Sequence, residues 1–297
     1  MRAYTYAHTH THTQTHTQTN KHAYTQDKGQ RKFGFDGVIP PESDNNQAYE
    51  LAVSSIVRNV LQGFNGTVFA YGQTGSGKTY TVFGSREKNV PGIVTNAFQE
   101  IFDYVEATPL RMFLIRAYFL EVYQEKVCDL LTGEDNLDIQ VGKEGKVGVA
   151  GASYKVVSSL DEVMAVIGEG VQRQHVGSSH VNVGRSSRAH TLFKLIIESA
   201  IKTDKTEGKQ VRRGCGHKYN DGHTHTHMHT QGIKGKVLVS ELNFVDLAGS
   251  EALTYEYDEG QRKETKAINV HIQALTLTML YVESMCRSVF HVSACTF

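Results

Sequence analysis

The chain has 297 residues, of which 39% are hydrophobic and 27 are glycines, enough apolar material for the core of one α/β domain. Its 31 basic and 31 acidic residues give a formal net charge of zero, so the overall charge does not favour nucleic acid or a membrane surface as a partner. No apolar stretch reaches the roughly 18 residues of a membrane span. The four cysteines show no metal-ligand spacing, so we expect a cytoplasmic protein with reduced thiols.

The first thirty residues alternate largely between Thr and His, and the same alternation returns at 223–230. In a strand, a two-residue period would gather the histidines on one face, as a transition-metal site requires. Low-complexity tracts without apolar partners cannot bury such a face, however, and usually stay disordered. We therefore predict a disordered tract at 1–30 and a low-complexity insert at about 204–235.

Helical and extended patterns alternate along the rest of the chain, which predicts an α/β sheet. Apolar residues recur at helical spacing in 47–62, 93–105 and 161–174, and Asp44 or Asn45 is suited to cap the first helix. Apolar, aromatic and β-branched runs predict strands at 67–71, 112–123, 126–131, 190–201 and 236–245, with short Gly-rich strands within 137–157. The strands at 190–201 and 236–245 are expected to pair across the insert.

A phosphate-binding motif follows the strand at 67–71. Residues 72–79 read Gly-Gln-Thr-Gly-Ser-Gly-Lys-Thr, the complete G-x-x-x-x-G-K-[ST] pattern of a P-loop. The glycines let successive backbone N–H groups curve around phosphates. Lys78 is placed to reach the β and γ phosphates, and the Thr79 hydroxyl is placed to ligate Mg²⁺ at the start of a helix. The predicted nucleotide-binding residues are Gly72, Gln73, Thr74, Gly75, Ser76, Gly77, Lys78 and Thr79.

An acidic motif follows the strand at 236–245. Asp246 precedes Gly249 by three residues, and in this D-x-x-G pattern the aspartate holds Mg²⁺ directly or through water while the glycine N–H senses the γ-phosphate. Alone the pattern is weak, because a loop aspartate is more often a turn or cap residue. Together with a P-loop in the same chain, it predicts a nucleoside triphosphate site.

A serine-rich loop, Arg-Ser-Ser-Arg-Ala-His at 185–190, precedes the strand at 190–201. Its two serines are placed to reach Mg²⁺, the γ-phosphate or the attacking water, and its second arginine is placed to pair with Glu251 and join the two loops. A loop of this composition is otherwise ordinary solvated surface. The predicted catalytic residues are Ser186, Ser187, Arg188, Gly249 and Glu251, and the predicted metal ligands are Thr79, Ser187 and Asp246.

Taken together, these motifs resemble those of a kinesin motor domain. The resemblance rests on residues 33–38 (Phe-Gly-Phe-Asp-Gly-Val), 65–81, 186–190 and 245–251, with Leu-Glu-Val-Tyr at 120–123 and Asp-Leu-Leu at 129–131. The motifs occur in the family's order over roughly residues 31–283. Residues 191–199 are loosely similar to the centromere-associated branch of the family.

The resemblance implies a P-loop NTPase-type central mixed β-sheet flanked by helices on both faces. It further implies that 186–190 is the first switch, 246–251 the second switch and 259–283 the long relay helix. The implied cofactors are ATP and Mg²⁺, and the implied activity is ATP hydrolysis coupled to binding and movement along the microtubule. Tubulin would then be the partner, with no nucleic acid or membrane, and the location would be the cytoplasm and cytoskeleton.

The chain departs from the family's pattern at several positions. Ala189 stands where the family has serine, Ala252 stands where arginine is usual, and the relay helix lacks its glycines and serine. No Arg-x-Arg-Pro segment precedes Phe33, and nothing after Tyr281 resembles the family, so 284–297 is interpreted as a non-matching tail. We therefore expect a motor fold truncated at both ends, without its first strand and its C-terminal elements.

Three alternatives remain open. The departures favour a truncated or degenerate motor domain that binds nucleotide or microtubules without turnover. A GTPase shares the D-x-x-G pattern, but the sequence has no Asn/Thr-Lys-x-Asp base-reading motif. The third alternative is a fragment that does not fold, and stabilisation by Mg·ATP would argue against it.

Overall fold

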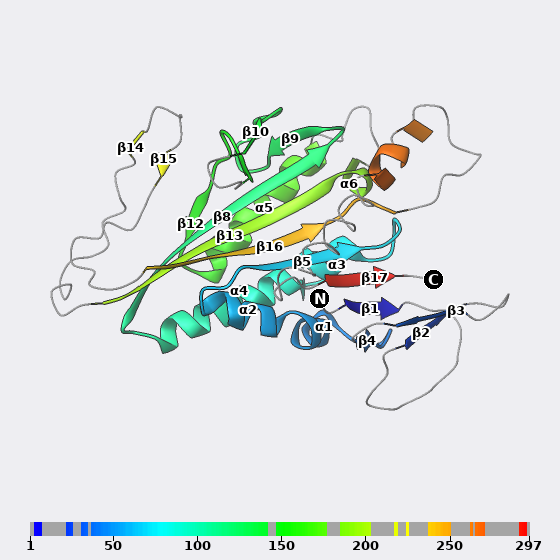
Figure 1. Ribbon diagram of the computed structural model, residues 1–297, viewed down its shortest axis with the longest axis horizontal. Coiled ribbons are helices and arrows are strands. Elements are labelled where there is room, and N and C mark those ends of the chain that lie inside the picture. The colour runs from blue at the N-terminus through cyan, green and yellow to red at the C-terminus, as the bar shows by residue number, and fades with distance from the viewer. Residues whose placement is uncertain are drawn as a thin grey trace.

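The protein is described here by a computed structural model for residues 3–7, 22–25, 31–34, 37–141, 147–176, 185–202, 217–218, 224–225, 237–250, 262–263, 265–270 and 291–295. Its main feature is a nine-stranded mixed sheet with the strand order β12-β8-β13-β16-β5-β17-β1-β4, to which β9 adds beside β8 (Figure 1). The strands of this sheet are β1 (Ala3–Ala7), β4 (Gly37–Ile39), β5 (Gly66–Tyr71), β8 (Arg111–Tyr123), β9 (Lys126–Asp129), β12 (Lys155–Val157), β13 (His190–Ile201), β16 (Leu238–Asp246) and β17 (His291–Cys295).

Four helices pack against one another beside this sheet: α1 (Asn45–Ala52), α2 (Ser54–Leu61), α4 (Ile93–Ala107) and α5 (Leu160–Val176). Figure 1 shows α5 running along β8 and β13. The apolar faces of the helices and the inward side chains of the strands form one core, in which Phe98, Phe119, Phe193 and Phe244 are fully buried. The predicted α/β fold, with a central mixed sheet flanked by helices, is confirmed.

The helix predicted at 47–62 is divided into α1 and α2. Asp44 caps α1, since its carboxylate accepts a hydrogen bond from Gln47 N at 2.8 Å while the Gln47 side chain accepts one from Asp44 N. Ser54 Oγ donates to Glu50 O at 3.0 Å. A serine hydroxyl that bonds back to the preceding turn competes with the helical pattern and bends the helix. The apolar periodicity alone did not reveal this break.

A glycine brings α2 close to the strand that carries the P-loop. A Cβ placed on Gly66, the first residue of β5, would lie 2.5 Å from Ile56 Cγ2 and 2.9 Å from Val60 Cγ2. Real Cβ atoms do not approach so closely, so any larger residue would push α2 off the strand. The P-loop that follows β5 is thereby supported by a tightly packed helix.

Both ends of the described chain contribute strands to the sheet, and the prediction of a motor fold truncated at both ends stays a prediction. β17 pairs in parallel with β5 through Val292 and Ser293, and β1 pairs in parallel with β17 over all five residues, beginning with Ala3 beside His291 (Figure 1). A further strand of the first tract, β2 (His22–Thr25), pairs with β3 (Arg31–Gly34). Most of the tract predicted to be disordered, 1–30, lies outside the described residues, so that prediction stays a prediction. Strand pairing uses backbone groups, so a sequence unlike the family's can still fill a place in the sheet.

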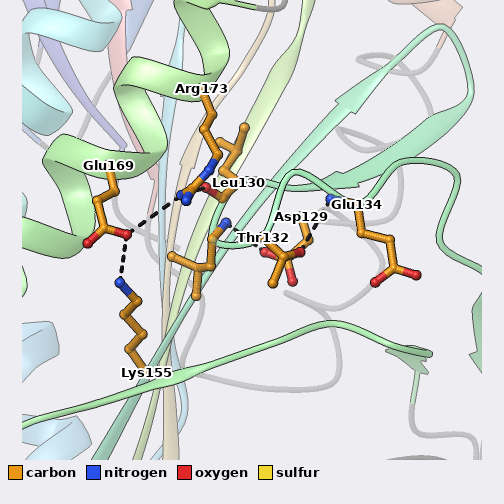
Figure 2. A network of polar contacts seen from close by, with 8 residues as sticks. Asp129, Leu130, Thr132, Glu134, Lys155, Glu169 and Arg173 are labelled. Atoms are coloured by element: carbon orange, nitrogen blue, oxygen red, sulfur yellow. Dashed lines mark hydrogen bonds and ion pairs between the residues drawn. The ribbon is translucent and has the colours of Figure 1, made fainter.

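Polar contacts fix α5, the helix that leads towards the first switch (Figure 2). Arg173 NH1 donates to Leu130 O at 2.9 Å, and Glu169 Oε2 lies 2.6 Å from Lys155 Nζ on β12. The Lys155 ammonium, through its hydrogen bond, holds the pKa of the Glu169 carboxyl below its usual value. At the end of β9, both carboxylate oxygens of buried Asp129 accept backbone N–H groups. The contacts of Arg173 and Glu169 tie α5 to the residue that follows β9 and to β12, at one edge of the sheet.

The remaining elements are short. They are α3 (Lys78–Phe83), α6 (Arg185–Arg188), and four two-stranded units that pair β2 with β3, β6 (Gly84–Ser85) with β7 (Val90–Pro91), β10 (Ile139–Val141) with β11 (Val147–Val149), and β14 (His217–Lys218) with β15 (Thr224–His225). Residues 262–263 and 265–270 are helical, and the rest of the predicted relay helix, like most of the insert, lies outside the described residues. No helix in the described part of the chain is long and apolar enough to cross a membrane.

Candidate nucleotide-binding site

The direction of three neighbouring strands brings the predicted motifs to one edge of the sheet. β16 is parallel to β5, with Asp246 beside Ala70, so the loops that follow both strands leave at the same edge. β13 is antiparallel to β16, with Thr191 beside Asp246, so the residues that precede β13 arrive at that edge too. The P-loop and both switches therefore converge at the carboxyl ends of β5 and β16, where open α/β sheets bind ligands.

The P-loop has the backbone conformation that its glycines predict. Gly75 and Gly77 have φ of 82° and 88°, a left-handed region that glycine adopts without strain. A Cβ built on either residue meets no atom within 4 Å, so it would project into open space above the loop. These positions therefore require glycine for conformation and leave the loop open to a ligand. Gly77 is also the N-cap residue of α3.

The charged residue of each motif, Lys78 in the P-loop and Asp246 in the acidic motif, is hydrogen-bonded to a residue of the P-loop. Lys78 is only 7% exposed, and its Nζ donates to Gln73 O at 2.9 Å, across the mouth of the P-loop. Thr79 Oγ1 donates to Asp246 Oδ2 at 2.5 Å, although the two residues are 167 positions apart. This bond unites two of the three predicted metal ligands.

Asp246 has the properties of a cation ligand. Burial raises the pKa of its carboxyl to about 6, while the Thr79 hydrogen bond and the Lys78 charge act in the opposite direction. Its Oδ1 is buried and has no hydrogen-bond partner among the described residues. A carboxylate oxygen beside a threonine hydroxyl and an open phosphate loop matches the oxygen donors that Mg²⁺ takes. The residues present therefore fit this ion.

The start of the second switch is held by four consecutive backbone N–H groups, each bonded to a different part of the site. Leu247 N donates to Ala70 O of β5 at 3.1 Å, and Ser250 N donates to Gly72 O of the P-loop at 3.1 Å. Between them, Gly249 N donates to Ser187 O of the first switch at 2.8 Å. The fourth, Ala248 N, donates to the Nδ1 atom of His190 at 3.1 Å. The second switch therefore has a defined position relative to both other loops.

The predicted residues of the first switch are brought to the site in part. Ser187 lies in α6 and lines the cavity beside the P-loop, and Ala189, the departure from the family's serine, is buried. Ser186 and Arg188 also belong to α6, but the side chain of Ser186 lies outside the described residues, as does Glu251. The predicted ion pair between Arg188 and Glu251 therefore stays a prediction.

A cavity of about 270 Å³ lies at the meeting point of these loops. It is formed by Thr74, Gly75, Gly77, Lys78, Thr79, Tyr80, Ser187 and Leu247. Its lining combines the P-loop with one residue from the first switch and one from the second. A polyphosphate bound here would contact all three motifs at once.

Two residues of the site were given no role in it from the sequence, although His190 is the last residue of the first-switch motif at 186–190. His190 accepts a hydrogen bond from a residue 58 positions away, which no local pattern reveals. Asn45 was considered only as a helix cap, but its side chain is buried and its Nδ2 donates to Tyr80 O at 3.0 Å and Pro91 O at 2.9 Å. It thereby fixes the short helix α3 that follows the P-loop. Burial of a polar side chain at the start of a helix would indicate such a role, but the sequence alone does not show burial.

The second switch also touches the helical residues that follow it. Ala248 and Ile268 are both buried and pack together with Tyr71, the last residue of β5. Ile268 belongs to the helical residues 265–270 and is one of the relay-helix positions at which the chain keeps the family's residue. The described structure therefore provides a packed path from the P-loop strand to this helix.

The P-loop, the acidic strand end and the two switch loops lie on a mixed sheet of the P-loop NTPase type. The kinesin motor domain family matches residues 2–289, and the chain belongs to this family. It is 38% identical over 245 residues to kinesin-like protein KIN-7L of Oryza sativa subsp. japonica, which is 82% of this chain and 34% of the relative. It is 37% identical over 222 residues to kinesin-related protein 11 of Dictyostelium discoideum, covering 74% of this chain and 29% of the relative.

A solved structure described as "Structure of a fast kinesin: Implications for ATPase mechanism and interactions with microtubules" superposes with a TM-score of 0.71. The sequence identity is 26%, and the superposition covers 92% of this chain and 76% of that one. The chain spans about a third of the length of these two relatives, and between 20% and 26% of the length of other plant kinesin-like relatives that it matches.

Proposed function

We propose that this chain is the nucleotide-hydrolysing part of a microtubule-dependent motor, which binds ATP with Mg²⁺ and couples hydrolysis to microtubule binding and movement. The observation that carries this proposal is the run of four backbone N–H groups, 247–250, that joins the second switch to β5, the first switch and the P-loop. Such a connection gives one bound phosphate group the means to act on both switches. Family membership supports the microtubule as the partner, and the cytoplasm and cytoskeleton as the location.

In this proposal the P-loop binds the phosphates. Residues 72–79 curve around them with backbone N–H groups, and Lys78 exchanges its bond to Gln73 O for the β and γ oxygens. Gly249 exchanges its bond to Ser187 O for the γ-phosphate, which moves the second switch. Phosphoryl transfer needs mainly positioning and stabilisation of charge, and these groups supply both.

The remaining predicted residues act around the γ-phosphate. Thr79, Ser187 and Asp246 would hold Mg²⁺, which would supply positive charge to the phosphate oxygens when bound. Ser186 orients the attacking water. Arg188 pairs with Glu251 and closes the site, which excludes bulk water during the chemical step.

The packed contact between Ala248 and Ile268 supports a route from the site to the microtubule. A shift of the second switch displaces Ala248, and close-packed side chains transmit such a shift to the helix at 265–270. The helix would then change its contact with the acidic surface of tubulin. Nucleotide state and microtubule affinity are linked in this way, and linkage is reciprocal.

The test is the Lys78→Ala variant of the full chain, with exposed Lys126→Ala on β9 as the control for loss of a lysine. We expect Lys78→Ala to lower nucleotide affinity and ATPase rate at least a hundredfold, since about 3 kcal/mol is lost when a charged hydrogen bond to phosphate disappears. Lys126→Ala should behave as the unaltered chain. An ATPase rate unchanged by Lys78→Ala would overturn the proposal.

A second candidate is a motor domain that binds nucleotide or microtubules without turnover. The observation that favours it is the buried Ala189 in the first switch, which offers no hydroxyl where the family has one. A single-turnover measurement of phosphate release distinguishes the two. Release of one phosphate per bound ATP supports the enzyme, and binding without release supports the second candidate.

A further inference from the structure

We propose that His190 is a positioning residue that holds the second switch. Its imidazole fixes the Ala248 backbone, and through it the contact between the second switch and the helical residues 265–270. The kinetic part of this inference rests on the proposed function. The structural part concerns the protein without nucleotide and can be tested separately.

Among the described residues, His190 is the only side chain that accepts one of the four N–H groups at 247–250. The acceptors of Leu247, Gly249 and Ser250 are backbone carbonyls of Ala70, Ser187 and Gly72. The acceptor of Ala248 N is the Nδ1 atom of His190. Substitution of a side chain leaves the backbone carbonyls in place. Of these four bonds, the one to His190 is therefore the one whose acceptor depends on the identity of a residue.

The imidazole is well supported for this task. His190 is the first residue of β13, where its backbone pairs with Val122 of β8, while the next residue, Thr191, pairs with Asp246. Neighbouring strands therefore fix the backbone from which the side chain projects. Because Nδ1 accepts this hydrogen bond, it carries no proton.

The bond determines where a buried contact lies. Ala248 is 1% exposed and packs against Ile268 and Tyr71. Without an acceptor, its N–H would be buried without a partner, which costs more than the net value of one hydrogen bond. The segment would then move to find another acceptor, and the contact with Ile268 would loosen. His190 therefore stabilises the arrangement that joins the nucleotide site to the helix.

Two substitutions separate the acceptor from the shape of the side chain. In His190→Asn, the amide oxygen lies two bonds beyond Cβ, as Nδ1 does, so it can accept the Ala248 N–H. In His190→Leu, a methyl group takes that place and accepts nothing. A third variant, His190→Gln, keeps an amide but moves its oxygen one bond farther out.

The first measurement is hydrogen exchange of the amides at 247–250 in the full chain without nucleotide. We expect His190→Leu to exchange about tenfold faster at Ala248, from loss of one buried hydrogen bond of about 1.4 kcal/mol. His190→Asn should stay within about threefold of the unaltered chain. Unchanged exchange in the β8 peptide around Phe119 shows that the core is intact. If His190→Leu does not fold, His190→Gln replaces it.

The second measurement is single-turnover hydrolysis and nucleotide affinity in the same variants. Since His190 does not line the cavity, nucleotide affinity should be preserved, while the hydrolysis rate falls about tenfold in His190→Leu and recovers in His190→Asn. Equal exchange at Ala248 in all variants, or an Asn variant as impaired as Leu, would overturn the inference. Absence of hydrolysis in the unaltered chain would count against the proposed function and leave the exchange result to decide the role of His190.

Discussion

The Asp246→Asn substitution is predicted to have opposite effects on stability and on binding of Mg·ATP. In the protein without metal, Asp246 is a buried carboxyl whose Oδ1 has no partner among the described residues and whose pKa is raised to about 6. Asparagine has no charge and can still accept the Thr79 hydroxyl through its carbonyl oxygen. It therefore removes the cost of burying a charge but loses the charge that would hold the cation.

The magnitude follows from the pKa shift. The carboxyl changes from about 3.8 in the unfolded chain to about 6 in the folded protein. About two pKa units correspond to about 3 kcal/mol of folding free energy lost when the carboxyl is ionised. An asparagine NH₂ without a partner offsets about 1 kcal/mol of the gain. The net stabilisation by Asp246→Asn is about 2 kcal/mol, or about 3 °C in Tm, at pH 7.5 without metal.

The sign of the pH dependence is fixed by the direction of the shift. The folded protein binds the proton of the Asp246 carboxyl more tightly than the unfolded chain does. The stability that this carboxyl contributes is therefore fully present below about pH 4 and is lost as the pH rises through about 6. The advantage of Asp246→Asn should therefore be large at pH 7.5 and small near pH 4.5. Thermal unfolding in EDTA at both pH values measures it. With Mg·ATP in hundredfold excess over Kd, the unaltered protein gains about 2.7 kcal/mol and the variant should gain much less.

Asp129→Asn is the matched control. Asp129 is fully buried at the end of β9, but both its oxygens accept backbone N–H groups, from Leu131 and from Ser153, at 2.7 Å. An NH₂ group there would face an N–H donor, so this substitution should destabilise the protein at either pH. A loss of metal-free stability in Asp246→Asn as large as in Asp129→Asn would refute the reasoning.

Two further predictions concern buried polar side chains. Ser76 Oγ in the P-loop is buried and has no partner among the described residues, so Ser76→Ala should raise the free energy of unfolding by about 1 kcal/mol without changing nucleotide affinity; a loss of affinity would mean that the hydroxyl contacts the ligand. Arg116 NH1 lies 2.8 Å from Glu198 Oε1, with both side chains 7% exposed. Arg116→Met should cost about 3–5 kcal/mol in urea unfolding, and adding Glu198→Leu should restore most of it; equal losses in the single and double variants would contradict the ion-pair explanation.

The sequence predicted well those features that are local or repeated along an element. The P-loop was found because its function requires a fixed order of glycines and one lysine, and the strand before it has a clear apolar pattern. The pairing of 190–201 with 236–245 was also predicted, and β13 pairs with β16 over nine residues. Along most of both strands, buried residues alternate with half-buried ones, and such a two-residue period is a strong strand signal in a sequence.

Features that depend on distant partners were missed. Neither β1 nor β17 has a distinctive apolar pattern, and each owes its place to backbone pairing with a neighbour almost 290 residues away in the chain, as when Ala3 pairs with His291. The break between α1 and α2 was missed for a local reason, because it falls beside Ser54, whose hydroxyl bonds back to Glu50 O, while the apolar periodicity continues across it. The part played by His190 depends on a bond to Ala248 that only the folded sheet creates.

The bonds at 247–250 also explain how the site would distinguish a nucleoside triphosphate from a diphosphate. Gly249 N already has an acceptor, Ser187 O, so the γ-phosphate gains only the difference between two hydrogen bonds. A neutral bond contributes about 1 kcal/mol and a bond to a charged group about 2 kcal/mol, which leaves about 1 kcal/mol in favour of the triphosphate. That difference is about fivefold in occupancy, so this exchange alone biases the switch without locking it. In the proposed cycle the second switch reopens after each hydrolysis, and such a small difference permits this.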